Sequence, residues 1–144
     1  MKILIVCSTT FYDKIDNIKS ELESKGHIIT PPNCYDAPVT SDDHKEMTEE
    51  EYLNFFRDMY YESRDKVNTV DAILVLNYSK EKNGQILENY IGASTFLEMY
   101  EAFMNNKKIY LYTNLPDEDH ILYDDIKAMN PICLNKNIEE IIND

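Results

Sequence analysis

The sequence predicts an α/β fold in which a five-stranded parallel sheet carries helices on both faces. Two observations support this prediction. Short apolar runs rich in β-branched residues are typical of strands that are buried on both faces. Segments with apolar residues at helical spacing separate these runs, and strands that alternate with helices form parallel sheets.

We expect five strands, in chain order, at Lys2–Cys7, His27–Thr30, Asp71–Asn77, Lys108–Thr113 and Pro131–Leu134. The alternating pattern contains no internal repeat and no linker. A flavodoxin-like, doubly wound sheet with the strand order 2-1-3-4-5 fits this pattern. The whole chain, residues 1–144, is therefore expected to form a single domain.

Helices are expected between the strands. Ile15, Ile18 and Leu22 recur at helical spacing, and Gly26 is a typical residue to follow a helix. A capping-box pattern at Thr48–Glu51 opens a second helix. One face of that helix carries five large apolar residues, which we expect to cover the sheet and also to meet a partner: Tyr52, Phe55, Phe56, Met59 and Tyr60.

Composition excludes several classes of protein. Hydrophobic residues make up 43% of the chain, which is enough for a packed core. Lysine and arginine number 14 against 27 acidic residues, a net charge of −13 that repels nucleic acid polymers. The three cysteines are widely spaced, as in proteins of a reducing compartment. The first apolar run is too short for a signal peptide or a membrane span, so we expect a cytoplasmic protein without membrane contact.

Sheets of this kind bind ligands beyond the carboxyl ends of their strands, where the strand order reverses. For the order 2-1-3-4-5 this crevice lies between the first and third strands. The segments Cys7–Tyr12 and Asn77–Ser94 follow those strands and are expected to be loops that lead into it. Glu98 lies at the edge of the same crevice.

Glu98 is the first candidate for chemistry. We expect it in the first turn of a helix, where free N–H groups and the positive end of the dipole keep a carboxylate ionised. An ionised carboxylate can act as a nucleophile. The alternative is structural: Thr95-Phe96-Leu97-Glu98 is itself a capping-box pattern, so Glu98 can simply close back on the N–H of Thr95.

The loop after the first strand offers further candidates. Ser8 and Thr9 are expected to bind a substrate oxygen or an anion. Phe11 or Tyr12 is expected to stack on a flat base. The alternative is that one of these rings packs down onto the helix while the other is a surface aromatic.

Four more residues lie at the expected crevice. Gly92 and Ser94 provide backbone and hydroxyl donors for a sugar or phosphate oxygen, or else form an ordinary turn and helix cap. Asn77 and Asn114 follow the third and fourth strands, where a buried amide holds a ligand hydroxyl or orients a loop. The three histidines share no spacing typical of a metal site, and we expect no metal.

Four segments, spread over nearly the whole chain, carry a resemblance to a known family. They are Lys2–Ser8, Asp71–Tyr78, Tyr90–Gly92 with Thr95–Met99, and Ile126–Ile132 with Leu134-Asn135. On these segments the chain resembles the nucleoside 2-deoxyribosyltransferase-like superfamily, which includes nucleoside transferases and nucleotide N-glycosidases. Small, mostly uncharacterised members look most similar to it.

The resemblance implies a Rossmann-like sheet, a nucleophile at Glu98 and a substrate-binding loop over Ser8–Tyr12. It also implies self-association, as a homodimer or a higher homo-oligomer. The expected activity is cleavage or transfer at the N-glycosidic bond of a nucleoside or nucleotide, without a metal or organic cofactor. Tyr12 would help to place the base or Glu98.

The alternative function is a binding module that senses a nucleotide in the same crevice without turning it over. Two departures from the family pattern favour it. Cys7 stands where the family often has a glycine before the serine of the first motif. Glu88 is the only carboxylate close before the glycine-hydroxyl loop, so the acid that protonates the leaving base is unassigned.

Overall fold

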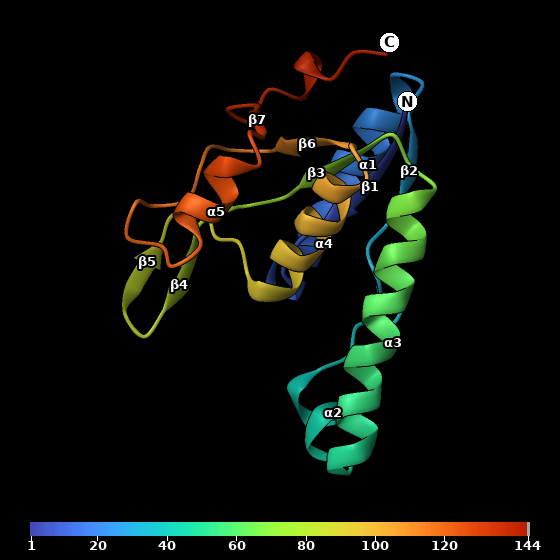
Figure 1. The fold of residues 1–144 in the computed structure, drawn as a ribbon, viewed down its shortest axis with the longest axis vertical. Coiled ribbons are helices and arrows are strands. Elements are labelled where there is room, and N and C mark those ends of the chain that lie inside the picture. Colours follow the sequence, from blue (N-terminus) through green and yellow to red (C-terminus); the bar gives the residue numbers. More distant parts are fainter. Residues whose placement is uncertain (144) are drawn as a thin grey trace.

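The protein is described by a computed structural model over residues 1–143, and it confirms the α/β fold with a five-stranded parallel sheet (Figure 1). The strands of this sheet are β1 (Lys2–Val6), β2 (Ile28–Thr30), β3 (Ala72–Val75), β6 (Lys108–Leu111) and β7 (Ile132–Cys133). They are arranged side by side in the order β2-β1-β3-β6-β7, and every neighbouring pair is parallel.

Two further strands, β4 (Lys80–Lys82) and β5 (Gln85–Leu87), form a separate antiparallel pair where the sequence predicted only a loop. In chain numbering, the order of the main sheet therefore differs from the predicted 2-1-3-4-5. The turn between β4 and β5 is Asn83-Gly84, and both residues have positive φ, 53° and 75°. An Asn-Gly pair is the strongest short-range signal for such a hairpin, and our sequence analysis missed it.

The helices are the 3-10 helix η1 (Thr9–Lys14), α1 (Ile15–Ser24), α2 (Ser41–Lys45), α3 (Glu49–Asn68), α4 (Ala93–Met104), α5 (Tyr123–Ala128) and the 3-10 helix η2 (Ile138–Glu140). The last of these is a single short turn. Within residues 1–143, no helix combines the length and the apolar character needed to cross a membrane.

Alternating side chains of the central strands point into two separate cores. Ile3 and Ile5 of β1 belong to the core that α1 covers, together with the buried side chains Ile15 and Leu22 of that helix. Leu4 and Val6 of β1 face the opposite core, which α4 and α5 cover. Because both faces of the sheet are covered, its strands are continuous apolar runs, as predicted.

The long helix α3 departs most from the prediction. Its N-terminal half extends past the sheet and lies beside α2 (Figure 1), and Val67 near its end is its buried residue. The expectation that its aromatic face covers the sheet is wrong. Three rings of that face instead surround His44 of α2, with ring centroids 5.2–6.3 Å from the histidine: Tyr52, Phe55 and Phe56. Contacts between aromatic rings thus join α2 to α3.

Candidate active site

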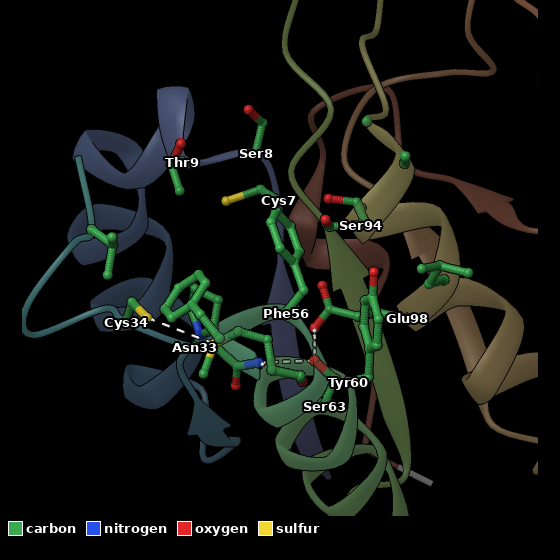
Figure 2. A pocket seen from close by; sticks show the side chains of 18 of the residues that line it. Cys7, Ser8, Thr9, Asn33, Cys34, Phe56, Tyr60, Ser63, Ser94 and Glu98 are labelled. Carbon is green, nitrogen blue, oxygen red and sulfur yellow. Dashed lines mark hydrogen bonds between the residues drawn. The ribbon is translucent and has the colours of Figure 1, made fainter. Parts of the chain in front are cut away.

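A cavity of about 690 Å³ lies at the carboxyl end of β1, between three parts of the chain. The first part is the end of β1 with the start of η1, and the second is the segment after β2 together with α3. The third is the segment that leads into α4 and the first turns of that helix. Figure 2 shows side chains from all three parts around the cavity. Its volume falls within the range of small-molecule sites.

Glu98 lies in the wall of this cavity, but not in the position that the sequence suggested. Gly92 is the N-cap of α4 and Ala93 is its first residue, so Glu98 lies in the second turn of the helix, and the first turn holds no acidic residue. The helix start therefore does not hold the carboxylate ionised. The N-cap of α4 has no side-chain cap, so the alternative role of Glu98 as a capping residue is also wrong.

The environment of Glu98 raises its pKa from 4.5 to about 7. Burial is the main cause, because a carboxylate loses hydration when protein surrounds it. A hydrogen bond from Ser63 and the charge of Lys66 act in the opposite direction and favour the ionised form. At neutral pH the carboxyl group is therefore divided between its protonated and ionised forms.

A chain of hydrogen bonds leads from the segment after β2 to this carboxyl group (Figure 2). Asn33 Nδ2 lies 2.9 Å from Ser63 Oγ, to which it donates. Ser63 Oγ donates to Glu98 Oε2 over 3.2 Å. Asn33 Nδ2 also donates to the carbonyl oxygen of Met59 over 3.2 Å. Asn33, Ser63 and Glu98 come from three separate parts of the chain, so only the folded chain joins them.

Tyr12 lines the cavity, as predicted, but its hydroxyl donates to the carbonyl oxygen of Asn33 over 2.6 Å rather than to Glu98. Its partly buried ring packs against the core under α1. Burial, together with the nearby Cys7 and Glu98, raises the pKa of the Tyr12 hydroxyl, which stays protonated at neutral pH. Its expected direct contact with Glu98 is therefore replaced by an indirect one through Asn33 and Ser63.

Cys34 and Cys7 also line the cavity, and Cys7 is a second potential nucleophile in addition to Glu98. Burial raises the pKa of its thiol to about 12, and the negative charges of Glu98 and Asp13 act in the same direction. A protonated thiol is a poor nucleophile. Glu98 is therefore the better nucleophile of the two at neutral pH.

Four of the predicted binding residues do line the cavity: Ser8, Thr9, Gly92 and Ser94. Figure 2 shows Ser8 and Ser94 in the upper part of the view, with Cys7 beside Ser8. Gly92 has an ordinary negative φ, so its backbone conformation does not require a glycine. Glycine is needed here because it has no side chain, and the space beside it is already occupied. A Cβ atom there would come within 3.3 Å of the hydroxyl oxygen of Tyr90, another residue of the wall.

Three other predicted binding residues lie outside the cavity wall. Phe11 is 4% exposed and belongs to the core, where its ring contacts Tyr78, so its expected stacking on a base is wrong. Asn77 is fully buried and donates from Nδ2 to the carbonyl oxygen of Asn114, while its Oδ1 accepts from the N–H of Thr113. Asn114 is exposed and bonds to Asn135. Both amides orient loops, the alternative role that the sequence left open.

Sequence reasoning missed the contribution of α3 and of the segment after β2. Phe56, Tyr60 and Ser63 line the cavity from one face of α3, and Asn33 and Cys34 line it from the segment after β2. The spacing of three and four residues between Phe56, Tyr60 and Ser63 was a usable signal, since it places a serine at the end of an aromatic stripe. No local signal linked Asn33 to that stripe.

Comparison with family models, with curated proteins and with solved structures finds no significant match for this chain. Within residues 1–143, no group of three or more histidine, cysteine, aspartate and glutamate side chains is arranged to hold a metal ion.

Proposed function

We propose that this protein cleaves the N-glycosidic bond of a nucleoside or nucleotide, or transfers the sugar between bases, with Glu98 as the nucleophile. The observation that carries the proposal is one carboxyl group, buried in an aromatic cavity and bonded to Ser63, with its pKa raised to about 7. Perturbed carboxyl groups in clefts are typical of catalytic sites. The proposal includes membership of the nucleoside 2-deoxyribosyltransferase-like superfamily.

The reaction begins when one oxygen of the ionised Glu98 attacks the anomeric carbon of the sugar. The bond from that carbon to the base nitrogen breaks, and the base leaves with the electron pair and takes up a proton. Water or a second base then attacks the glycosyl-enzyme and releases Glu98. The transition state resembles a positively charged oxocarbenium ion, which a nearby carboxylate stabilises.

The walls of the cavity suit the two halves of such a substrate. Phe56 and Tyr60 offer flat apolar surface for a base, in place of the stacking first assigned to Phe11. Ser8 and Ser94 offer hydroxyl groups for sugar or phosphate oxygens. A cavity that offers both hydroxyl groups and aromatic rings fits a molecule that is polar at its sugar and flat at its base.

The second candidate function is a module that binds a nucleotide without cleaving it. One observation favours it: Asn77, Asn114 and the hydroxyl of Tyr12 all bond to the protein itself, which leaves fewer polar groups for a sugar. A panel of nucleosides and nucleotides, incubated with the protein and then separated by chromatography, distinguishes the two. Free base supports the enzyme, whereas thermal stabilisation by a nucleotide without free base supports the module and contradicts the enzyme.

We further propose that the protein forms a homodimer or a larger assembly. Apolar side chains on α4 and on the facing part of α3 are about half exposed beside the cavity: Tyr60, Leu97, Tyr100, Phe103 and Met104. Exposed apolar residues gathered in this way are typical of interaction surfaces. A partner molecule on this surface would also cover the mouth of the cavity, since three of the five residues line it.

A further inference from the structure

The hydroxyl group of Ser63 can donate to more than one acceptor, and in the structure it donates to Glu98. A serine in a helix commonly donates its hydroxyl hydrogen to the carbonyl oxygen four residues earlier, which for Ser63 is that of Met59. Asn33 Nδ2 donates to that same carbonyl oxygen over 3.2 Å and also donates to Ser63 Oγ over 2.9 Å. Both interactions of the Asn33 amide direct the single hydroxyl hydrogen of Ser63 toward Glu98.

This orientation of the Asn33 amide leaves one of its polar atoms without a hydrogen bond in the part of the chain that the structure describes. Its Oδ1 is buried and has no hydrogen-bond partner among the described residues. The opposite orientation would place Oδ1 against the Met59 carbonyl oxygen, which is an acceptor and would repel it. The backbone of Asn33 is fixed in turn by the Tyr12 hydroxyl, which donates to its carbonyl oxygen over 2.6 Å. Hydrogen bonds thus link Tyr12, Asn33 and Ser63, from three parts of the chain, to one carboxyl oxygen of Glu98.

We propose that Asn33 and Ser63 form a positioning relay that holds Oε2 of Glu98 and leaves Oε1 free to attack the substrate. This inference rests on the proposed function, because it assigns the relay to the nucleophile of that reaction. Neither Asn33 nor Ser63 transfers a proton in this role. Asn33 orients Ser63, and Ser63 orients Glu98 and stabilises its ionised form with a hydrogen bond.

Other ionisable groups also act on Glu98, so the test must separate them from the relay. Lys66 of α3 favours the ionised carboxylate and pairs with Glu62 over 3.2 Å. The other titratable groups around the cavity are Cys7, Tyr12, Cys34, His44, Tyr60, Arg64, Tyr90, Tyr100 and Glu101. Neither Ser63→Ala nor Asn33→Ala changes any of these groups, so a shift in the titration of Glu98 reports the relay.

The experiment is a pH titration of the Glu98 carboxyl group by carbon NMR, in protein labelled at the glutamate side-chain carboxyl carbon. The signal that Glu98→Gln removes identifies the residue. Ser63→Ala is expected to raise the pKa of Glu98 by about one unit, because the ionised form loses its hydrogen bond. Asn33→Ala is expected to raise it less, since the Ser63 hydroxyl then divides its time between Glu98 and the Met59 carbonyl. Ser63→Thr keeps a hydroxyl and should restore the wild-type value.

The double variant is the decisive measurement. If Asn33 acts through Ser63, then Asn33→Ala has no further effect once residue 63 is alanine. Ser20→Ala on α1 and Asn68→Ala on α3, both exposed, are matched controls that should leave the titration unchanged. An unchanged pKa in Ser63→Ala, or equal shifts from Asn33→Ala with and without Ser63, would overturn the relay.

The same variants separate the relay from the proposed function. In an active enzyme, Ser63→Ala should lower kcat at neutral pH with little change in KM, and its pH profile should move upward with the pKa of Glu98. If the NMR shifts follow the expected pattern while wild-type protein releases no base from any nucleoside or nucleotide, then the relay stands and the proposed function fails. If base is released but the NMR shifts are absent, the relay fails alone.

Discussion

Among single residues, Glu98 must be ionised for the proposed reaction, whereas the fold is more stable when its carboxyl group is protonated. Glu98→Gln keeps the size and most of the hydrogen-bonding reach of the side chain but removes the charge that attacks the sugar. We expect base release to fall by at least three orders of magnitude, on the order seen for lost covalent nucleophiles. Chromatography of free base measures the loss, and near-native activity of Glu98→Gln would contradict the assigned mechanism.

The same substitution should stabilise the fold, in a manner that depends on pH. Because the pKa of Glu98 is raised from 4.5 to about 7, the folded state binds the proton more tightly than the unfolded state, and stability falls as pH rises between these values. At pH 8 we expect Glu98→Gln to raise the free energy of unfolding by about 1–3 kcal/mol, and at pH 4 to change it little. Urea denaturation at both pH values measures this. Equal effects at pH 4 and pH 8 would show that the carboxyl group is not buried as described.

The pH dependence of the rate follows from the same pKa. A nucleophilic carboxylate must be ionised, so kcat/KM should rise about tenfold per pH unit below pH 7 and level off above about pH 8. A nucleoside whose base does not titrate in this range isolates the contribution of the enzyme. A profile that is flat between pH 5.5 and pH 8.5 would exclude Glu98 as the group that controls the rate.

At the scale of elements, η1 is tied to the segment after β2 by one hydroxyl group. Tyr12→Phe keeps the ring that packs on the core and removes the bond to the carbonyl oxygen of Asn33. We expect a loss of about 1 kcal/mol in the free energy of unfolding. Tyr12→Ala also removes the ring and should cost about 2–4 kcal/mol. Denaturant titrations compare the variants, and an unchanged midpoint in Tyr12→Ala would show that the ring supports neither the core nor the segment.

The helix α3 shows how one pattern can serve two structural purposes. Its aromatic stripe has the spacing of a helix that packs on a sheet, yet Phe56 and Met59 line the cavity and Phe55 packs against His44 of α2. Helical spacing specifies that side chains share a face, and it does not specify what that face meets.

For the whole molecule, we expect association through the exposed apolar surface of α4 and α3. Phe103→Lys places a charge on that surface and should shift the protein toward monomer in light scattering at high micromolar concentration. Ile121→Lys, at a 91% exposed residue outside α3 and α4, is the matched control. Because each chain carries a net charge of −13, added salt should strengthen the association by screening repulsion. A wild-type protein that stays monomeric at high salt would contradict this prediction.

The sequence by itself determined that the chain forms a five-stranded parallel sheet with both faces covered. Strands of a parallel sheet that is covered on both faces need apolar side chains at every position. The result is a continuous apolar run in the sequence, as in Ile3–Val6 and Ala72–Val75. The same topology placed Ser8, Gly92 and Glu98 around one crevice, since the carboxyl ends of parallel strands meet at one edge. The hairpin at Asn83-Gly84 was equally available from the sequence, although we did not use its signal.

Only the tertiary structure decided the environment of Glu98. Its raised pKa depends on burial by packed segments of the chain. Its hydrogen bond comes from Ser63, 35 residues away, to which Asn33, 65 residues away, donates. The sequence shows which groups can donate or accept a hydrogen bond, but a serine in a helix can reach either its own backbone or a distant carboxylate. Burial and the choice among partners arise from packing between distant segments, and no local pattern records them.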